Sequence, residues 1–302
     1  MAGGALNSDR LDTFPKLLME NARVRGNRPA NREKDLGIWL TWTWKEVAEE
    51  VRALACGLKQ LGVEPEDKVS ICGDNRPHLY WAISAVQAIG ATPVPLYQDS
   101  VADEMQYIYE HAEAKYAIVE DQEQVDKLLE IKSKLPNLKH IIYEDARGML
   151  HYEEEFLHDY ATIQNDGRLY DTANPQYYKK SVDRGRGEDV AIILYTSGTT
   201  GRPKGVMLSY DNLIISAANV NAREHLDENE EVLAYLSMAW IGDNMFSFAQ
   251  AYAAGFCVCC PESGETVLDD LREIGPTFFF APPRIFESVS YTHLTLPTKR
   301  IV

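Results

Sequence analysis

Short apolar runs alternate with helical patterns along most of this chain, and this alternation constrains the fold more than any other feature. The early apolar runs predict strands at 38–42, 68–72, 92–96, 116–119 and 140–143. A helical pattern separates each strand from the next, at 47–61, 77–89, 101–112 and 123–134. Such strands can pair in parallel while the helices cover both faces of the sheet. The predicted class is therefore α/β, with two doubly wound βα subdomains.

Local signals set several helix boundaries. Thr43 and Glu46 have the spacing of a capping box at the start of the first long helix, and Gly62 is expected to end that helix. Ser100 is predicted to cap the helix that follows it. An amphipathic helix is also predicted over 11–25.

Residues 144–187 interrupt the alternation because they are polar, acidic and aromatic. They are predicted to form a helix near 152–161 and then a surface linker. Beyond them, strands are predicted at 189–195, 204–208, 232–236, 256–260 and 277–280, and helices at 210–225, 243–254, 266–274 and 282–289. The predicted organisation is a first subdomain over 1–187 and a second, incomplete part over 188–289.

The last residues, 290–302, match no preceding element. We interpret them as a non-native tail that resembles translated adapter sequence, and a native terminal strand is the alternative. The tail is expected to pack poorly and to make no functional contact.

Charge and cysteine usage limit the environment of the protein. A formal net charge of −16 argues against nucleic acid as a partner, because phosphate backbones repel an acidic surface. Cys257, Cys259 and Cys260 share one apolar run without a second pair of zinc ligands, so buried, reduced thiols and a cytoplasmic location are predicted. No window reaches the ~18 apolar residues of a membrane span, so any membrane association is expected to be peripheral.

One segment carries most of the chemical information. An apolar strand leads at Tyr195 into a loop rich in hydroxyl groups and glycine, composed of Thr196, Ser197, Gly198, Thr199, Thr200, Gly201, Arg202, Pro203, Lys204 and Gly205. Glycine allows backbone N–H groups to approach an anion, and hydroxyl groups donate to phosphate oxygens. Lysine adds a positive charge. The segment therefore predicts a polyphosphate-binding loop.

The loop is not a Walker A motif. That motif has glycine directly before lysine and a helix after it, whereas Arg202 and Pro203 separate Gly201 from Lys204. The apolar residues 206–208 predict a strand instead, which disfavours a P-loop kinase or GTPase. A flexible surface loop is the other alternative, and it is disfavoured because the segment follows a buried strand and ends in Pro-Lys-Gly.

The run Thr196-Ser-Gly-Thr-Thr-Gly-Arg-Pro-Lys-Gly205 resembles the phosphate-binding signature of the adenylate-forming superfamily, which includes acyl-CoA synthetases and firefly luciferase. The resemblance extends over about residues 11–288, and residues 278–287 resemble long-chain acyl-CoA synthetases. Residues 234–243 align with a family segment that usually reads L-P-L-x-H-x-x-E. Trp240 stands where His is usual and Asp243 where Glu is usual. A core aromatic is the alternative for Trp240.

The resemblance implies a ligase that uses ATP, Mg²⁺ and CoA to convert a long-chain fatty acid to an acyl-adenylate and then to a thioester. Thr196 would help to hold Mg²⁺, and residues 197–201 would wrap the β- and γ-phosphates. Lys204 would neutralise the leaving pyrophosphate, so Thr196 and Lys204 are the candidate catalytic residues. Trp240 and Asp243 are assigned to the acyl channel.

The resemblance also implies missing parts. The family's adenine- and ribose-binding segments and its C-terminal catalytic lysine do not occur within these 302 residues. The chain is therefore expected to be incomplete and inactive by itself. Another adenylate-forming ligase, for medium-chain or aryl acids, and a non-catalytic nucleotide-binding module remain as alternatives. The acyl chain length and the oligomeric state do not follow from the sequence.

Overall fold

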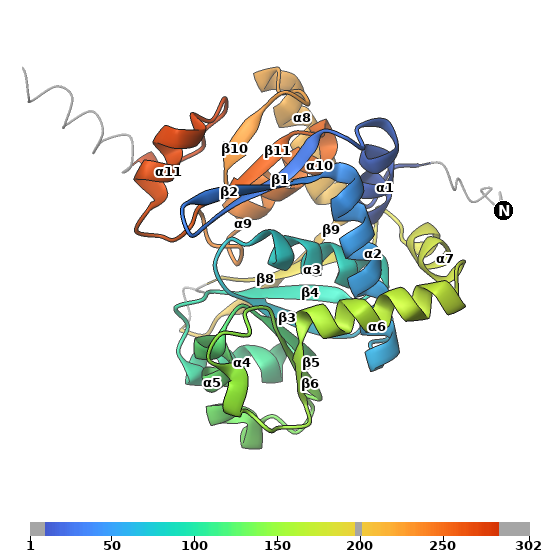
Figure 1. The fold of residues 1–302 in the computed structure, drawn as a ribbon, viewed down its shortest axis with the longest axis vertical. Helices are drawn as coiled ribbons and strands as arrows, with labels where there is room; N and C mark the ends of the chain where they lie inside the picture. The colour runs from blue at the N-terminus through green and yellow to red at the C-terminus, as the bar shows by residue number, and fades with distance from the viewer. Residues whose placement is uncertain (1–9, 197–200, 284–302) are drawn as a thin grey trace, which may run out of the picture.

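The centre of the molecule is a parallel five-stranded sheet. The computed structural model describes residues 10–196 and 201–283 (Figure 1). The strand order is β4 (Thr92–Leu96), β3 (Lys68–Cys72), β5 (Ala114–Val119), β6 (His140–Tyr143) and β7 (Leu157–Asp159). All neighbouring pairs are parallel, as the alternation predicts, but the predicted strand at 38–42 belongs to another sheet, where it pairs antiparallel.

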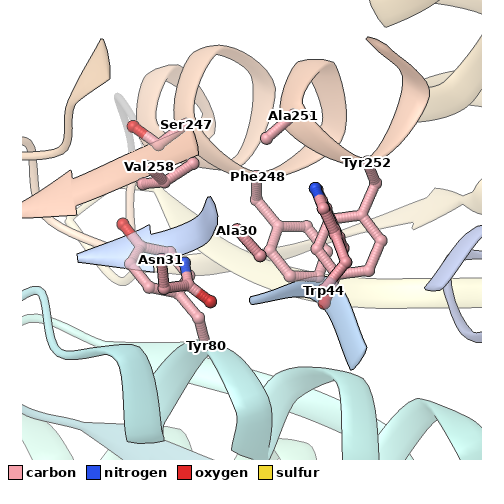
Figure 2. A pocket seen from close by; sticks show the side chains of 9 residues that line it. All are labelled: Ala30, Asn31, Trp44, Tyr80, Ser247, Phe248, Ala251, Tyr252 and Val258. Atoms are coloured by element: carbon pink, nitrogen blue, oxygen red, sulfur yellow. The ribbon is translucent and has the colours of Figure 1, made fainter. Parts of the chain in front are cut away.

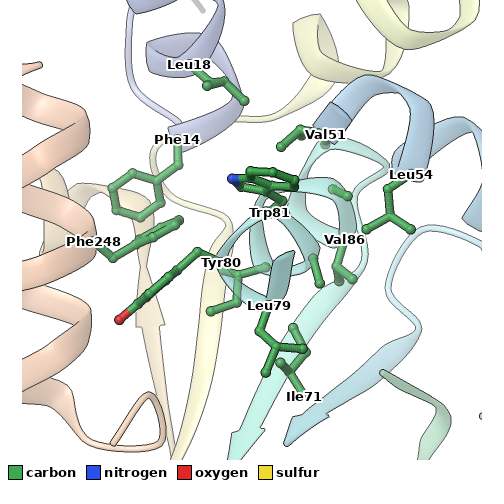
Figure 3. Packing of buried hydrophobic residues seen from close by; sticks show 14 of the residues in the cluster. Phe14, Leu18, Val51, Leu54, Ile71, Leu79, Tyr80, Trp81, Val86 and Phe248 are labelled. Atoms are coloured by element: carbon green, nitrogen blue, oxygen red, sulfur yellow. The ribbon is translucent and has the colours of Figure 1, made fainter. Parts of the chain in front are cut away.

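Helices cover both faces of this sheet, which confirms the doubly wound α/β class. Val69 and Ile71 point into a core shared with α2 (Trp44–Leu61) and α3 (Pro77–Ala88), part of which is shown in Figure 3. The opposite face packs on α4 (Ala102–Ala112) and α5 (Gln122–Ile131), which a short 3₁₀ turn, η1 (Lys132–Lys134), extends. Successive strand residues thus enter two different cores, because side chains alternate across a sheet.

A second sheet combines strands from distant parts of the chain. Its order is β10 (Glu231–Leu233), β11 (Cys257–Cys260), β1 (Pro29–Asp35) and β2 (Ile38–Thr43), and only β1 and β2 pair antiparallel. Around it lie α1 (Phe14–Val24), α8 (Tyr210–Glu224), α10 (Gln250–Ala254) and α11 (Val267–Ile274). The sheet takes strands from both predicted parts of the chain, and the boundary between 187 and 188 stays a prediction.

Strand β1 has no counterpart among the predicted strands. Its sequence is polar, so it lacks the apolar alternation of a half-buried strand. Arg32 pairs with Glu231 at 2.9 Å and Lys34 pairs with Asp270 at 2.9 Å, so partners from the distant second half of the chain neutralise its two basic residues.

Most of the predicted helix ends agree with the structure. Thr43 and Glu46 form the capping box, and Gly62 ends α2 with a φ of 101°. The prediction for Ser100 is wrong, because Val101 is the N-cap of α4 and no side chain caps that end. All five cysteines are free and buried, which confirms the prediction made for Cys257, Cys259 and Cys260, the three that lie in β11.

The predicted helix at 152–161 and the surface linker after it are wrong. The chain forms η2 (Met149–His151) and then β7, followed by α6 (Tyr160–Ala173) and α7 (Tyr177–Arg184). Helix α6 packs closely on α2 through two glycines, Gly57 and Gly167. Because glycine adds no apolar side chain to the helical pattern, the sequence of α6 carries only a weak helical signal.

Two predictions near the end of the described chain also differ. The predicted helix at 243–254 is divided into α9 (Ile241–Asp243), a π-helical turn η3 (Asn244–Ala249) and α10. No strand forms at 277–280, where Thr277 bonds Glu231 and the carbonyl oxygen of Phe280 accepts from the Tyr235 hydroxyl. Most of the predicted helix at 282–289 and the whole tail 290–302 lie outside the described residues.

Candidate phosphate-binding site

The candidate loop closes an antiparallel hairpin of β8 (Val190–Thr196) and β9 (Lys204–Ser209). The prediction of a strand after the loop is therefore confirmed, and Lys204 lies in that strand rather than in a helix. Strand β8 packs beside β4, and their first residues, Val190 and Thr92, line one groove. The loop consequently leaves β8 on the side where the parallel strands have their carboxyl ends, which is the usual ligand-binding edge of such sheets.

The register brings the two candidate catalytic residues together. Thr196, the last residue of β8, pairs directly with Lys204, the first residue of β9. Residues directly opposite in an antiparallel pair share a face, with Cβ atoms about 4.5–5.5 Å apart. Both side chains are exposed. A hydroxyl group and an ammonium group therefore stand side by side at the open end of the hairpin, where an anion in solution can reach them.

The tip of the loop is only partly described. Ser197, Gly198, Thr199 and Thr200 lie outside the described residues, so their predicted roles stay predictions. Gly201 has a φ of 95°, in the left-handed region that favours glycine. A glycine at this position lets the chain turn back into β9.

On the side of the hairpin that faces α4, three carboxylates outnumber the one cation of the groove, Arg202. Tyr195 points into the core beside α4, and on that side a groove of about 560 Å³ separates the loop from the exposed carboxylates of Asp103, Glu104 and Glu110. These carboxylates repel phosphate. Because side chains alternate along β8, Thr196 projects to the side opposite Tyr195. The face that bears Thr196 and Lys204 is therefore the one suited to a polyphosphate.

Trp240, a channel candidate, lies near the surface. The residue directly precedes α9, and it is 36% exposed. The centroid of its ring lies 6.3 Å from that of Phe280. The indole also covers Gly242, where a Cβ atom would lie 2.2 Å from the ring. Ile241 beside it is 40% exposed, so this turn presents an apolar surface to solvent.

Asp243, the other channel candidate, faces the interior. It is 1% exposed, and its two carboxylate oxygens accept from the Tyr80 hydroxyl at 2.9 and 2.8 Å. The amide of Asn75 donates to Oδ1 at 3.3 Å. Burial raises the pKa of Asp243 from 3.8 to about 7. The structure therefore separates the two candidates, because Trp240 reaches solvent and Asp243 does not.

Four residues near these positions are not predicted from the sequence. Asn75 and Tyr80 bond Asp243 from more than 160 positions away, so no local pattern indicates them. Tyr107 and His111 on α4 contact the residues that flank the loop. Their spacing of four on a predicted helix places them on one face, and it is the only signal in the sequence that could have drawn attention to them.

The described residues fit Mg²⁺ only as part of a nucleotide complex. Within 10–196 and 201–283, no three His, Cys, Asp or Glu side chains gather into a metal site. Mg²⁺ bound to nucleotide usually takes one or two protein oxygens, with phosphates and water completing its shell. The exposed hydroxyl of Thr196 suits that arrangement.

A small cavity lies beside the second sheet, and the described parts of the chain contain no membrane-spanning helix. The cavity between Trp44, Tyr80 and Tyr252 has about 10 Å³, the space of a single water molecule (Figure 2). No helix in the described ranges is long and apolar enough to cross a bilayer.

Solved structures define the class of this fold. A long-chain-fatty-acid–CoA ligase from Archaeoglobus fulgidus superposes with a TM-score of 0.75 at 19% identity, over 94% of this chain and 54% of that one. An anthranilate–CoA ligase in complex with anthranoyl-AMP superposes with a TM-score of 0.73 at 22% identity, over 89% of this chain and 49% of that one. The fold is that of the N-terminal domain of adenylate-forming enzymes.

The sequence then identifies the family. The chain belongs to the AMP-binding enzyme family, whose model matches residues 18–300. It is 32% identical over 291 residues to a long-chain-fatty-acid–CoA ligase of Xenopus laevis, covering 92% of this chain and 38% of the relative. It is 32% identical over 277 residues to long chain acyl-CoA synthetase 4 of Arabidopsis thaliana, covering 84% of this chain and 38% of the relative. The chain thus spans less than half the length of these relatives.

Proposed function

We propose that this chain forms the ATP-phosphate-binding part of a ligase that activates a long-chain fatty acid, first to an acyl-adenylate and then to acyl-CoA. The observation that carries the proposal is the pairing of Thr196 with Lys204 at the open end of the β8–β9 hairpin. Membership in the AMP-binding enzyme family supports ATP as the nucleotide. The names of the two curated relatives support a long-chain fatty acid and CoA as the other substrates.

In this proposal the chain acts mainly by positioning and by stabilising charge. The ammonium group of Lys204 neutralises charge that develops on the pyrophosphate leaving group. The hydroxyl of Thr196 holds Mg²⁺, which neutralises charge on phosphate oxygens when it is bound with ATP. Residues 197–201 add hydroxyl and backbone donors to the β- and γ-phosphates.

The acyl group and the compartment are further parts of the proposal. The apolar turn of Trp240 and Ile241 suits the mouth of a channel for a hydrocarbon chain, and Asp243 would anchor that turn from inside. The five free, buried thiols suit a reducing cytoplasm.

Binding of Mg²⁺-tripolyphosphate to purified 1–302 tests the phosphate site directly. We expect measurable binding by titration calorimetry, and at least about tenfold weaker binding by Lys204→Ala and by Thr196→Val. Lys45→Ala is the matched control, because Lys45 is 67% exposed on α2 and remote from the hairpin. Equal binding by Lys204→Ala and Lys45→Ala would contradict the assignment.

Catalysis needs a second experiment with a complete enzyme that contains this segment. Exchange of pyrophosphate into ATP in the presence of palmitate measures adenylation. Loss of one charge-stabilising donor costs about 10²–10³ in rate, so we expect a reduction of that size in Lys204→Ala. Chain 1–302 alone is expected to form no acyl-CoA, and an exchange rate unchanged by Lys204→Ala would refute the proposed role.

A further inference from the structure

Helix α4 contacts both ends of the phosphate loop. Tyr107 and His111 are one helical turn apart, on the face of α4 that packs on the hairpin. The Nδ1 atom of His111 lies 2.7 Å from the hydroxyl oxygen of Tyr195, the residue just before Thr196. The incoming arm of the loop is therefore tied to α4 directly beside one candidate catalytic residue.

The outgoing arm is tied in the same way. The hydroxyl of Tyr107 donates to the carbonyl oxygen of Pro203 at 3.0 Å, and Pro203 directly precedes Lys204. The guanidinium of Arg202 lies 5.5 Å from the centroid of the Tyr107 ring, within range of a cation–π interaction. The second anchor thus stands directly beside the other candidate catalytic residue.

Two features of the hairpin leave its outgoing arm in need of support from outside the hairpin. A two-stranded sheet is only marginally stable by itself, and although β8 is buried beside β4, β9 is largely exposed and pairs with β8 alone among the described strands. Pro203 also lies outside the ladder, which begins at the pair of Thr196 and Lys204. The bond from Tyr107 therefore fixes a carbonyl group that the hairpin itself does not fix.

We infer that α4 is a brace that sets the separation of the two arms of the phosphate loop, with Tyr107 and His111 as positioning residues for Thr196 and Lys204. The inference rests on the proposed function for its consequence in binding. Both residues contact the hairpin from the side opposite the exposed hydroxyl and ammonium groups, so they act through the loop and not on the phosphates.

The side chains of the brace are suited to positioning more than to stability. His111 is exposed and Tyr107 is only half-buried. Polar contacts at such positions add little to the free energy of unfolding, because water replaces them when they are lost. Their removal should therefore change the affinity for phosphate more than the unfolding midpoint.

Single substitutions test each anchor on purified 1–302 with Mg²⁺-tripolyphosphate as the probe. Tyr107→Phe keeps the ring and removes the bond to Pro203, and His111→Ala removes the bond to Tyr195. We expect each to weaken binding about three- to tenfold, the range of one lost hydrogen bond, with only a small shift of the urea midpoint. His111→Asn, which keeps a polar group near the Nδ1 position, should recover part of the loss.

Two comparisons separate positioning from a general effect. Tyr170→Phe removes a hydroxyl group on α6, away from the loop, and should bind as the wild type does. In a double-mutant cycle, Tyr107→Phe should have a smaller effect in a Lys204→Ala background, because its influence passes through that residue. Unchanged affinity in both Tyr107→Phe and His111→Ala would overturn the brace while leaving the proposed function intact.

Hydrogen exchange tests the brace without any ligand. Peptides that cover 201–206 should exchange faster in Tyr107→Phe than in the wild type or in Tyr170→Phe, because the outgoing arm loses its anchor. Equal exchange in all three proteins would overturn the brace. If wild-type 1–302 fails to bind tripolyphosphate, the proposed function fails, and the exchange result still decides whether α4 holds the loop.

Discussion

Replacement of the buried carboxyl group of Asp243 by an amide should stabilise this protein at neutral and alkaline pH. Burial raises the pKa of Asp243 from 3.8 to about 7, and the groups that face it are the neutral side chains of Tyr80, Asn75 and Ser247. Among the residues that the structure describes, no cation is found to offset the cost of ionising the carboxyl group. Asn has the same shape, keeps an oxygen that accepts from Tyr80, and carries no charge.

The size of the effect follows from the two pKa values. Between about pH 4 and pH 7 the folded protein holds a proton on Asp243 that the unfolded chain releases, so stability falls as the pH rises. Each pH unit in this window costs about 1.4 kcal/mol, which gives about 3 kcal/mol between pH 5 and pH 7. Above pH 7 both states are ionised and the contribution becomes constant.

Urea unfolding at pH 5, 6, 7 and 8 measures this difference. The free energy of unfolding of Asp243→Asn minus that of the wild type should increase by about 3 kcal/mol from pH 5 to pH 8, with the change complete near pH 7. Asp99→Asn, at an exposed loop position, is the control and should show a constant difference. A constant difference for Asp243→Asn as well would refute the argument that an uncompensated buried carboxyl group lies at this position.

Two further substitutions test the packing of the fold. A Cβ atom at Gly167 would lie 1.8 Å from the carbonyl oxygen of Ala53, so Gly167→Ala should lower the free energy of unfolding by at least about 2 kcal/mol. Gly264 has open space around it, so Gly264→Ala should lower the free energy of unfolding by less than about 0.5 kcal/mol. Equal melting temperatures of the two variants would argue against the close α2–α6 contact. Arg76→Ala removes the guanidinium group that lies 2.8 Å from the partly buried carboxylate of Glu120. We expect the free energy of unfolding in urea to fall by about 3–5 kcal/mol, and a fall below about 1 kcal/mol would contradict this expectation.

The sequence predicts the central sheet well because its signals are local. Four of the five early predicted strands form four of its five strands, whereas the fifth, at 38–42, belongs to the second sheet as β2. Gly62 ends α2 as expected. Apolar periodicity and capping residues depend on near neighbours in the chain, so they can be interpreted without tertiary contacts. The phosphate loop belongs to the same category, because its glycine, hydroxyl and lysine residues are contiguous.

Other elements depend on partners that are distant in the sequence. Strand β1 is polar, and its Arg32 and Lys34 form ion pairs with partners about 200 and 236 positions away, Glu231 and Asp270. Helix α6 carries a glycine where α2 approaches closely, so its apolar pattern is weak. In both cases the stabilising contact comes from outside the local window, and local patterning cannot indicate it.

The candidate site shows the same division. The sequence by itself determines that Thr196 and Lys204 bracket a loop suited to phosphate. Tertiary structure alone decides that these two residues become cross-strand partners and that side chains of α4 contact both arms of the loop. It also decides that Asp243 is buried beside Tyr80 while Trp240 reaches solvent. The physical reason is that residue type sets which chemistry is available, whereas strand register and burial set which groups meet and which of them keep a charge.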